Sequence, residues 1–259
     1  MRVAGPARAE LVESAASCLA RLRERRPRVH VLTNLVAMTV SANALLAVGA
    51  VPSMTFRADA VADFVAGSAA LVVNLGMLDA ERELAIESAV PLARELGRPW
   101  VLDPVKVERS GARRALALAL LDRSPDVLRA NAAEIAALGL GGAPDDVASA
   151  LAHRTGGAVA ATGVVDRITD GRRERRLANG SPLMDRATAM GCTCSALVGA
   201  FLAVEPDPFL AAVAAVLCFG VAGEVAAERA GGPGTLVPEL LDALYGLDGA
   251  TLAARARLA

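Results

Sequence analysis

The residues best suited to chemistry lie in one short stretch, 188–195, which reads Thr-Ala-Met-Gly-Cys-Thr-Cys-Ser and runs into an apolar segment. Small residues before such a segment predict a loop that enters the first turn of a helix. The unpaired N–H groups and the dipole at that end of a helix favour an anion such as phosphate. They would also favour the thiolate of Cys192, which is a candidate nucleophile or general base, or else a packed small residue.

Two carboxylates elsewhere have spacings that suit a metal or a turn. Asp103 follows a predicted apolar strand and precedes proline, so it can hold a hydrated Mg²⁺ or cap a turn or helix. Glu134 stands three residues after Asn131, which is the spacing of a capping box. Glu134 can also act near Mg²⁺, and Arg129 can contact a nucleotide phosphate. Thr162, before a glycine, offers a hydroxyl and exposed amides to phosphate.

The elements that must position these residues alternate between strands and helices. Strands are expected at 29–33, up to Met54, at 70–75, 99–102, 127–129 and 158–162, and at 166–169 and 173–177, which flank an Asp-Gly hairpin turn. Helices are expected at 7–25, through Leu45, at 58–65, 78–96, 113–121, 132–138, 145–154, 192–204, 208–230 and 237–245, and at the C-terminus. This order predicts an α/β protein with a mainly parallel sheet flanked by helices on both faces. Ligands of such sheets bind at the carboxyl ends of the strands.

Composition narrows the class of protein. The 259 residues are 54% hydrophobic but only 3% aromatic, so the core must come from Ala, Val and Leu, and we expect a single domain over 1–259. A net charge of −1 gives no reason to expect nucleic acid or a membrane surface as partner. The four cysteines suit neither a disulfide scaffold nor a zinc site. The N-terminus lacks a signal-peptide pattern, and the apolar stretch 209–223 falls short of a spanning helix, so we expect a cytoplasmic protein.

Taken in order, these segments resemble the hydroxyethylthiazole kinase family, whose members belong to the ribokinase-like superfamily and act in thiamin salvage. The matching motifs cover roughly residues 28 to 246. They are Leu32-Thr33-Asn34, Ser41-Ala42-Asn43, Gly49-Ala50, Asn74-Leu75-Gly76, Asp103-Pro104-Val105, Arg129 with Asn131 and Glu134-Ile135, Thr162-Gly163, Thr169-Asp170-Gly171, Asn179-Gly180, Gly191-Cys192 with Ser195-Ala196, and Leu240-Leu241-Asp242.

The resemblance implies a homotrimer with thiazole sites between subunits, which uses ATP and Mg²⁺ to phosphorylate the hydroxyl of 4-methyl-5-(2-hydroxyethyl)thiazole. The roles it implies fall into three groups. They are thiazole contacts from Asn34, Met54, Gly76, Ala189 and Cys192, ATP contacts from Arg129, Thr162 and Gly191, and magnesium contacts from Asp103 and Glu134. Cys192 stands where most of the superfamily has an aspartate that accepts the alcohol proton. A thiol of ordinary pKa, about 8.5, is a poor base at neutral pH unless the helix terminus lowers it.

Two departures from the family leave alternatives open. The family loop Gly-Thr-Gly-Cys is here Ala189-Met190-Gly191-Cys192, and the lost first glycine adds a Cβ that opposes a positive φ. The stretch after Asp103-Pro104-Val105, which is usually rich in glycine in the family, is here Lys106-Val107-Glu108-Arg109. Lys106, the only lysine of the chain, either clamps ATP phosphates or is a solvated loop residue. The chain is then a thiazole kinase, a kinase of a different small heterocyclic alcohol, or a binding homologue with weakened catalysis.

Overall fold

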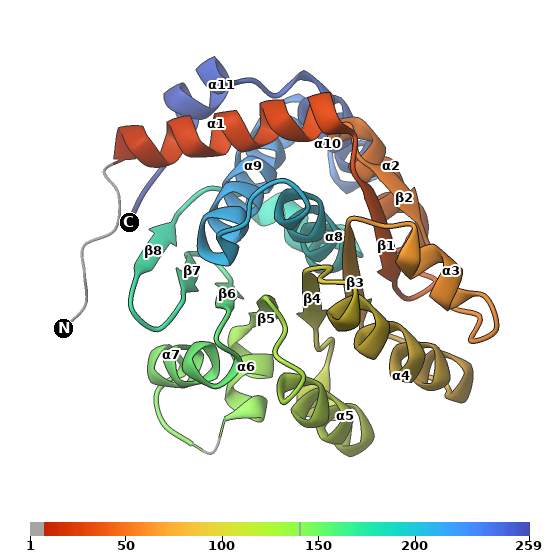
Figure 1. The fold of residues 1–259 in the computed structure, drawn as a ribbon. Helices are drawn as coiled ribbons and strands as arrows, with labels where there is room; N and C mark the ends of the chain where they lie inside the picture. Colours follow the sequence, from red (N-terminus) through yellow and green to blue (C-terminus); the bar gives the residue numbers. More distant parts are fainter. Residues whose placement is uncertain (1–7, 140) are drawn as a thin grey trace.

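A computed structural model describes residues 8–139 and 141–259, and its centre is an eight-stranded sheet in the order β2-β1-β3-β4-β5-β6-β7-β8 (Figure 1). The strands are β1 (Arg28–Leu32), β2 (Val51–Ser53), β3 (Ala70–Asn74), β4 (Trp100–Asp103), β5 (Val127–Asn131), β6 (Ala158–Thr162), β7 (Asp166–Thr169) and β8 (Glu174–Leu177). Strands β1 to β6 pair in parallel, while β7 and β8 pair antiparallel. The predicted α/β class and the mainly parallel sheet are therefore confirmed.

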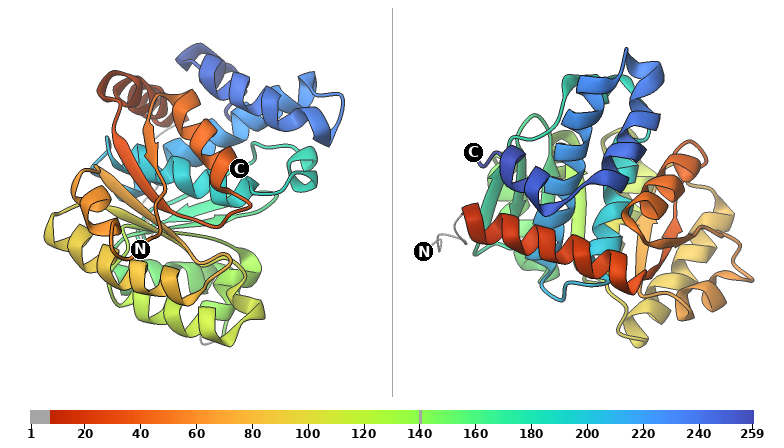
Figure 2. Two further views of the ribbon diagram at one scale, coloured as in Figure 1. Left: turned by 90° about the vertical axis from the view of Figure 1, so that its right-hand side faces the viewer. Right: turned by 90° about the horizontal axis from the view of Figure 1, so that it is seen from above.

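Helices cover both faces of the sheet, and each face has its own apolar core (Figure 1). One layer consists of α1 (Arg8–Arg25), α2 (Met38–Val48), α8 (Met190–Leu202), α9 (Pro208–Arg229), α10 (Pro233–Gly246) and α11 (Gly249–Arg255). The other consists of α3 (Val61–Ala66), α4 (Ala80–Glu95), α5 (Gly111–Leu121), α6 (Ala132–Leu138) and α7 (Pro144–Thr155). Seen from above, α1 crosses the outside of its layer, where it packs against α9 and α11 (Figure 2).

Most element boundaries agree with the sequence, and the differences have simple causes. Strands β6 and β7 and helix α6 have their predicted bounds. Helix α10 begins at Pro233, four residues earlier than the expected 237, because proline is well tolerated in the first turn. The start of the predicted helix 7–25 lies outside the described residues at position 7, and from Arg8 it is confirmed.

Helix α9 needs separate comment because its length is enough to cross a membrane. It has 22 residues, more than the apolar stretch 209–223 alone, and its most apolar 18-residue window has a mean hydropathy of 2.2. Of its most apolar window, 89% is buried inside the protein, which identifies α9 as a core helix. Among residues 8–139 and 141–259, no other helix meets the length and hydropathy of a membrane span.

Helix α8 lies directly on the sheet, and this contact aims its N-terminus at one edge. At Gly199 a Cβ would stand 2.3 Å from a methyl group of Val72 on β3, so only glycine fits at this closest approach. The first turn of α8 therefore lies at the carboxyl ends of the parallel strands. Ala189 and Cys192 are placed there by the packing of this helix.

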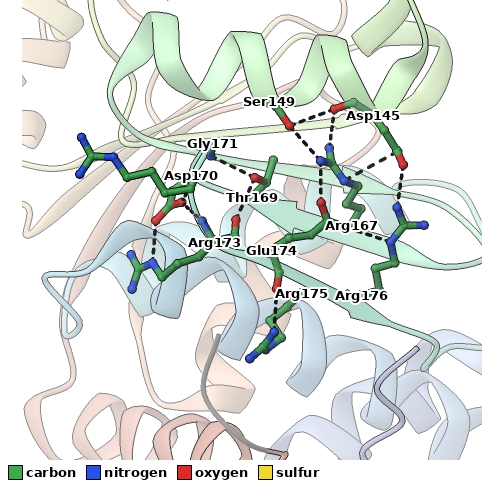
Figure 3. Close-up of polar contacts among 11 residues, drawn as sticks. Asp145, Ser149, Arg167, Thr169, Asp170, Gly171, Arg173, Glu174, Arg175 and Arg176 are labelled. Carbon is green, nitrogen blue, oxygen red and sulfur yellow. Dashed lines mark hydrogen bonds and ion pairs between the residues drawn. The ribbon is translucent and has the colours of Figure 1, made fainter. Parts of the chain in front are cut away.

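The β7–β8 hairpin is tied to its neighbours by the group of side chains that we call the hairpin ion-pair cluster (Figure 3). Its charged members are Asp145, Arg167, Asp170, Arg173, Glu174, Arg176 and Asp207. Arg167, whose side chain is 5% exposed, donates to the Glu174 carboxylate at 2.8 Å and to the Ser149 hydroxyl of α7 at 2.9 Å. The predicted hairpin turn is confirmed at Gly171, whose φ is 85°.

Candidate active site

A cleft of about 1130 Å³ opens at the carboxyl ends of the central parallel strands, beside the N-terminus of α8. Every predicted site residue except Met54 lines it. These residues are Asn34, Gly76, Asp103, Arg129, Glu134, Thr162, Ala189, Gly191 and Cys192. The cleft therefore brings together residues from five different strand ends and one helix start, as ligand sites of open α/β sheets do.

A buried chain of hydrogen bonds runs across the cleft floor. Asp103 Oδ2 accepts from Ser195 Oγ at 2.8 Å and from Asn74 Nδ2 at 2.7 Å. Asn74 Oδ1 in turn accepts from Asn34 Nδ2 at 3.0 Å, and the same Asn34 nitrogen lies 3.5 Å from the sulfur of Cys192. Each amide thus has a fixed orientation, and α8 is joined to the ends of β1, β3 and β4.

Asp103 is the least satisfied charge of the floor. It is 0% exposed, and its second oxygen, Oδ1, has no hydrogen-bond partner among the described residues. Burial raises the pKa of Asp103, and the charge of Arg129 offsets part of that shift. A buried carboxylate oxygen without a partner is costly. An oxygen in this state suits a cation or a donor supplied by a ligand.

Arg129 faces the start of α8. Its Nη2 donates to the Thr162 hydroxyl at 2.5 Å, while its buried Nε has no partner among the described residues. A Cβ at Gly191 would lie 2.6 Å from Arg129 Nη1, so glycine lets the guanidinium reach the first turn of α8. A guanidinium beside the free amides of a helix start is a site that favours an anion.

Glu134 forms the predicted capping box with Asn131, which is confirmed. Its Oε2 accepts from the Asn131 amide, and its Oε1 accepts from the Lys106 amide, each at 2.9 Å. Burial raises the pKa of Glu134, although these amides stabilise its charged form. Within the part of the chain that is described, no three His, Cys, Asp or Glu residues gather as a metal cage. Mg²⁺ uses one or two carboxylates plus substrate phosphates and water, and Asp103 with Glu134 fits that donor set.

The structure corrects the expectation that the helix terminus favours a thiolate at Cys192. Burial raises the pKa of Cys192 to about 11, and the charge of Asp103 adds to this effect. The hydrogen bonds from Asn74 and Asn34 oppose the shift without cancelling it. Cys192 is therefore a thiol at neutral pH, since the cost of burying a charge outweighs the field of the first turn of α8.

Left-handed backbone gathers around the cleft. Among the described residues, five non-glycine residues have positive φ, and three of them line the cleft: Met77 at 51°, Lys106 at 55° and Ala189 at 70°. Ala189 therefore adopts the positive φ that its Cβ opposes, and it is the N-cap of α8. Such conformations cost about 1–2 kcal/mol each outside glycine, and they concentrate at functional sites.

Met54 is the one predicted site residue that lies apart. It follows β2 at the edge of the sheet, where it is half-buried and packs against the apolar core of the layer that contains α2. It does not line the cleft of its own chain. The sequence places Met54 on a strand end but does not say how far that strand stands from the centre of the sheet.

Sequence reasoning missed the parts played by Ser195 and Asp166. Ser195 lies one helical turn after Gly191, and this spacing was a signal for a second contact from α8. Asp166 starts β7 and lines the cleft, where it accepts from the Gly163 amide at 2.9 Å. Burial raises the pKa of Asp166 to about 6, while that hydrogen bond opposes the shift.

The fold and the cleft define the ribokinase-like class. The structure of the pyridoxal kinase from Staphylococcus aureus in complex with pyridoxal has a TM-score of 0.62 at 18% identity, over 76% of this chain and 88% of that one, which shows the shared fold. Closer matches identify the family. A hydroxyethylthiazole kinase structure from Pyrococcus horikoshii OT3 has a TM-score of 0.91 at 38% identity, covering 95% of this chain and 98% of that chain.

The sequence comparisons agree with the structural one. The model of the family described as "Hydroxyethylthiazole kinase family" matches residues 19–249. A hydroxyethylthiazole kinase from Granulibacter bethesdensis is 49% identical over 260 residues, covering 95% of each chain. The chain therefore belongs to the hydroxyethylthiazole kinase family.

Proposed function

We propose that this chain is an enzyme that transfers the terminal phosphoryl group of ATP to the hydroxyl of 4-methyl-5-(2-hydroxyethyl)thiazole, in thiamin salvage. The observation that carries the proposal is a single cleft in which the buried, partly unsatisfied Asp103 faces Arg129 and the start of α8. Phosphoryl transfer depends mainly on positioning and on stabilising the charge of the phosphoryl oxygens. These groups can supply both. We infer that they act within a single cytoplasmic domain.

Arg129, Thr162 and Gly191 form the phosphate end of the cleft in this account. Arg129 supplies charge, Thr162 fixes the guanidinium by its hydroxyl, and Gly191 leaves the amides of α8 open to oxygens. Asp103 and Glu134 would hold Mg²⁺, directly or through water. When bound there, the ion would neutralise charge on the phosphates.

Asn34, Gly76, Ala189 and Cys192 form the alcohol end. A Cβ at Gly76 would lie 2.6 Å from Asn34 Nδ2, so glycine is needed for this wall of the cleft. Because Cys192 is protonated at neutral pH, it contacts the alcohol as a thiol and does not serve as the base. The hydrogen-bonded chain of Asn34, Asn74 and Asp103 holds Cys192 in position for this contact.

We infer a homotrimer with the thiazole site between subunits. Met54 lies outside the cleft of its own chain, so its thioether can wall a thiazole only across such a boundary. Sedimentation at several protein concentrations tests the trimer. A monomer with full activity contradicts this part of the proposal.

A different heterocyclic alcohol is the second candidate substrate. Met190 is buried and lines the cleft at the point where the family loop has threonine, so the floor beside Cys192 has a changed shape. A kcat/KM that is much higher for another alcohol favours this reading.

The test of the proposed function is ADP release from ATP and Mg²⁺ by the purified protein, with and without the thiazole alcohol. We expect saturable, alcohol-dependent ADP. Thiazole binding in calorimetry without any ADP release indicates a binding homologue and contradicts the proposal.

A further inference from the structure

Lys106 lies on the cleft wall, three residues beyond Asp103, in the loop between β4 and α5. It is the only lysine of the chain. Its side chain is exposed, and its ammonium has no hydrogen bond or ion pair with any residue in the described ranges 8–139 and 141–259. It is therefore a free cation at the edge of a site built for an anion.

The backbone of Lys106 is held in a costly conformation. Its φ is 55° and its ψ is 35°, the left-handed region that favours glycine. Glu134 Oε1 accepts from its amide at 2.9 Å and so anchors the loop to the start of α6. A non-glycine residue fixed in this region at a site suggests that its side chain serves the site.

Three other charged side chains near Lys106 each have a partner. Arg129 donates to Thr162, and Arg113 donates to the backbone carbonyl of Val105 at 3.3 Å. Glu108, the carboxylate two residues after Lys106, has its Oε1 3.6 Å from Arg109 Nε. Lys106 thus lines the same cleft as the two carboxylates expected to hold magnesium, and its own charge is uncommitted.

We propose that the Lys106 ammonium binds oxygens of the β- and γ-phosphates of the nucleotide and contributes to ATP affinity. The inference rests on the proposed kinase function and names a cation particular to this chain. An ammonium on a flexible stem is a point charge that follows phosphate oxygens as they move, and it gives charge-assisted hydrogen bonds.

The single lysine allows a direct test by amine acylation followed by mass spectrometry of the peptide that contains Lys106. We expect ATP with Mg²⁺, and also inorganic tripolyphosphate, to slow acylation of Lys106 by about tenfold. Adenosine and the thiazole alcohol alone should leave the rate unchanged, since neither carries phosphate. Equal acylation with and without saturating ATP overturns the inference.

Substitutions provide an independent readout. In K106A and K106G the KM for ATP should rise by about tenfold, with the KM for the alcohol unchanged. K106R keeps the charge and should stay within about threefold of the wild type. K106G should melt no lower than the wild type because glycine accepts the left-handed backbone. A wild-type KM for ATP in folded K106A overturns the inference.

These experiments separate the inference from the proposed function. If ATP protects Lys106 from acylation but the protein phosphorylates no thiazole alcohol, the phosphate contact of Lys106 is supported and the proposed substrate is contradicted. If ADP release depends on the alcohol but ATP does not protect Lys106 from acylation, the phosphate contact of Lys106 is contradicted and the proposed function is supported. If calorimetry detects no ATP binding, both are contradicted.

Discussion

Two charged regions of the molecule differ in how their charges are satisfied. In the hairpin ion-pair cluster, every arginine named above has a carboxylate within 4.0 Å, and the buried Arg167 donates to three groups (Figure 3). In the cleft, one buried oxygen of Asp103 has no hydrogen-bond partner among the described residues. The ammonium of Lys106 also has no partner among them. Charge that is paired internally holds the fold together, whereas charge left unpaired is available to a ligand.

The strongest test of this contrast is D103N. It keeps the size of the side chain and an oxygen for Ser195 and Asn74, but it removes the charge that faces the cleft. We expect kcat for alcohol-dependent ADP formation to fall by about a thousandfold or more, with little loss of stability.

The matched control is D126N. Asp126 is also a carboxylate whose pKa is raised by burial, but it accepts from the Trp100 amide outside the cleft. Its kcat should stay at the wild-type level. If D126N and D103N lower kcat equally, the loss reflects the fold and the role given to Asp103 is wrong.

In the hairpin ion-pair cluster, R167M should have the opposite effect. Removing Arg167 takes one of its two arginine partners from Glu174 and takes the arginine donor from the Ser149 hydroxyl, so the free energy of unfolding should fall by about 3 kcal/mol. The kcat of the folded protein should not change. Chemical denaturation measures the first quantity and a steady-state assay the second.

R176M is the control for exposure, since the side chain of Arg176 is 41% exposed and pairs with Asp145 and Glu174. Its cost should be about 1 kcal/mol or less. A loss of kcat in R167M that exceeds its loss of stability would mean that the cluster takes part in catalysis.

The pH dependence of stability should have opposite signs in the two regions. Burial raises the pKa of Asp166 from 3.8 to about 6, so between these values the unfolded state releases its proton first. Wild-type stability should therefore decline relative to D166N by up to about 3 kcal/mol as the pH rises from 4 to 7.

In Asp170 of the cluster, burial opposes the shift, but hydrogen bonds and charge from Arg173 lower the pKa. The unfolded state then keeps its proton to higher pH, so wild-type stability should rise relative to D170N as the pH rises through the ordinary range of aspartate. Denaturation midpoints across pH measure both differences. The same sign in both pairs contradicts the distinction between the two regions.

The smallest expected effect concerns backbone strain at the cleft. A189G places glycine where φ is 70°, so the free energy of unfolding should rise by about 0.5 kcal/mol after the entropy of glycine is subtracted. A20G, on the exposed side of α1, should instead lose about 1 kcal/mol. If A189G is destabilised as much as A20G, the strain is absent.

Local patterns account for what the sequence predicts well. The Asn131–Glu134 capping box and the Asp-Gly turn depend on neighbours within four residues, and both are confirmed. The alternation of apolar runs predicts the parallel sheet, and with it the gathering of strand-end residues such as Asp103 and Thr162.

Contacts that depend on packing could not be predicted in the same way. The raised pKa of Cys192 follows from burial and from the nearby charge of Asp103, which together override the helix-start field that the sequence indicates. The bridge that Asn74 makes between Asp103 and Asn34 depends on the register of β1, β3 and β4. The distance of Met54 from the cleft follows from strand order, which local patterns do not contain.

The most direct test of the account is to measure the phosphorylated alcohol itself, by phosphorus NMR, in mixtures of ATP, Mg²⁺ and 4-methyl-5-(2-hydroxyethyl)thiazole. The account predicts that the wild type forms the phosphate monoester in step with ADP, and that D103N forms almost none while binding the thiazole. ADP without the monoester, or equal monoester from D103N, would contradict the assignment of the cleft as the site of transfer.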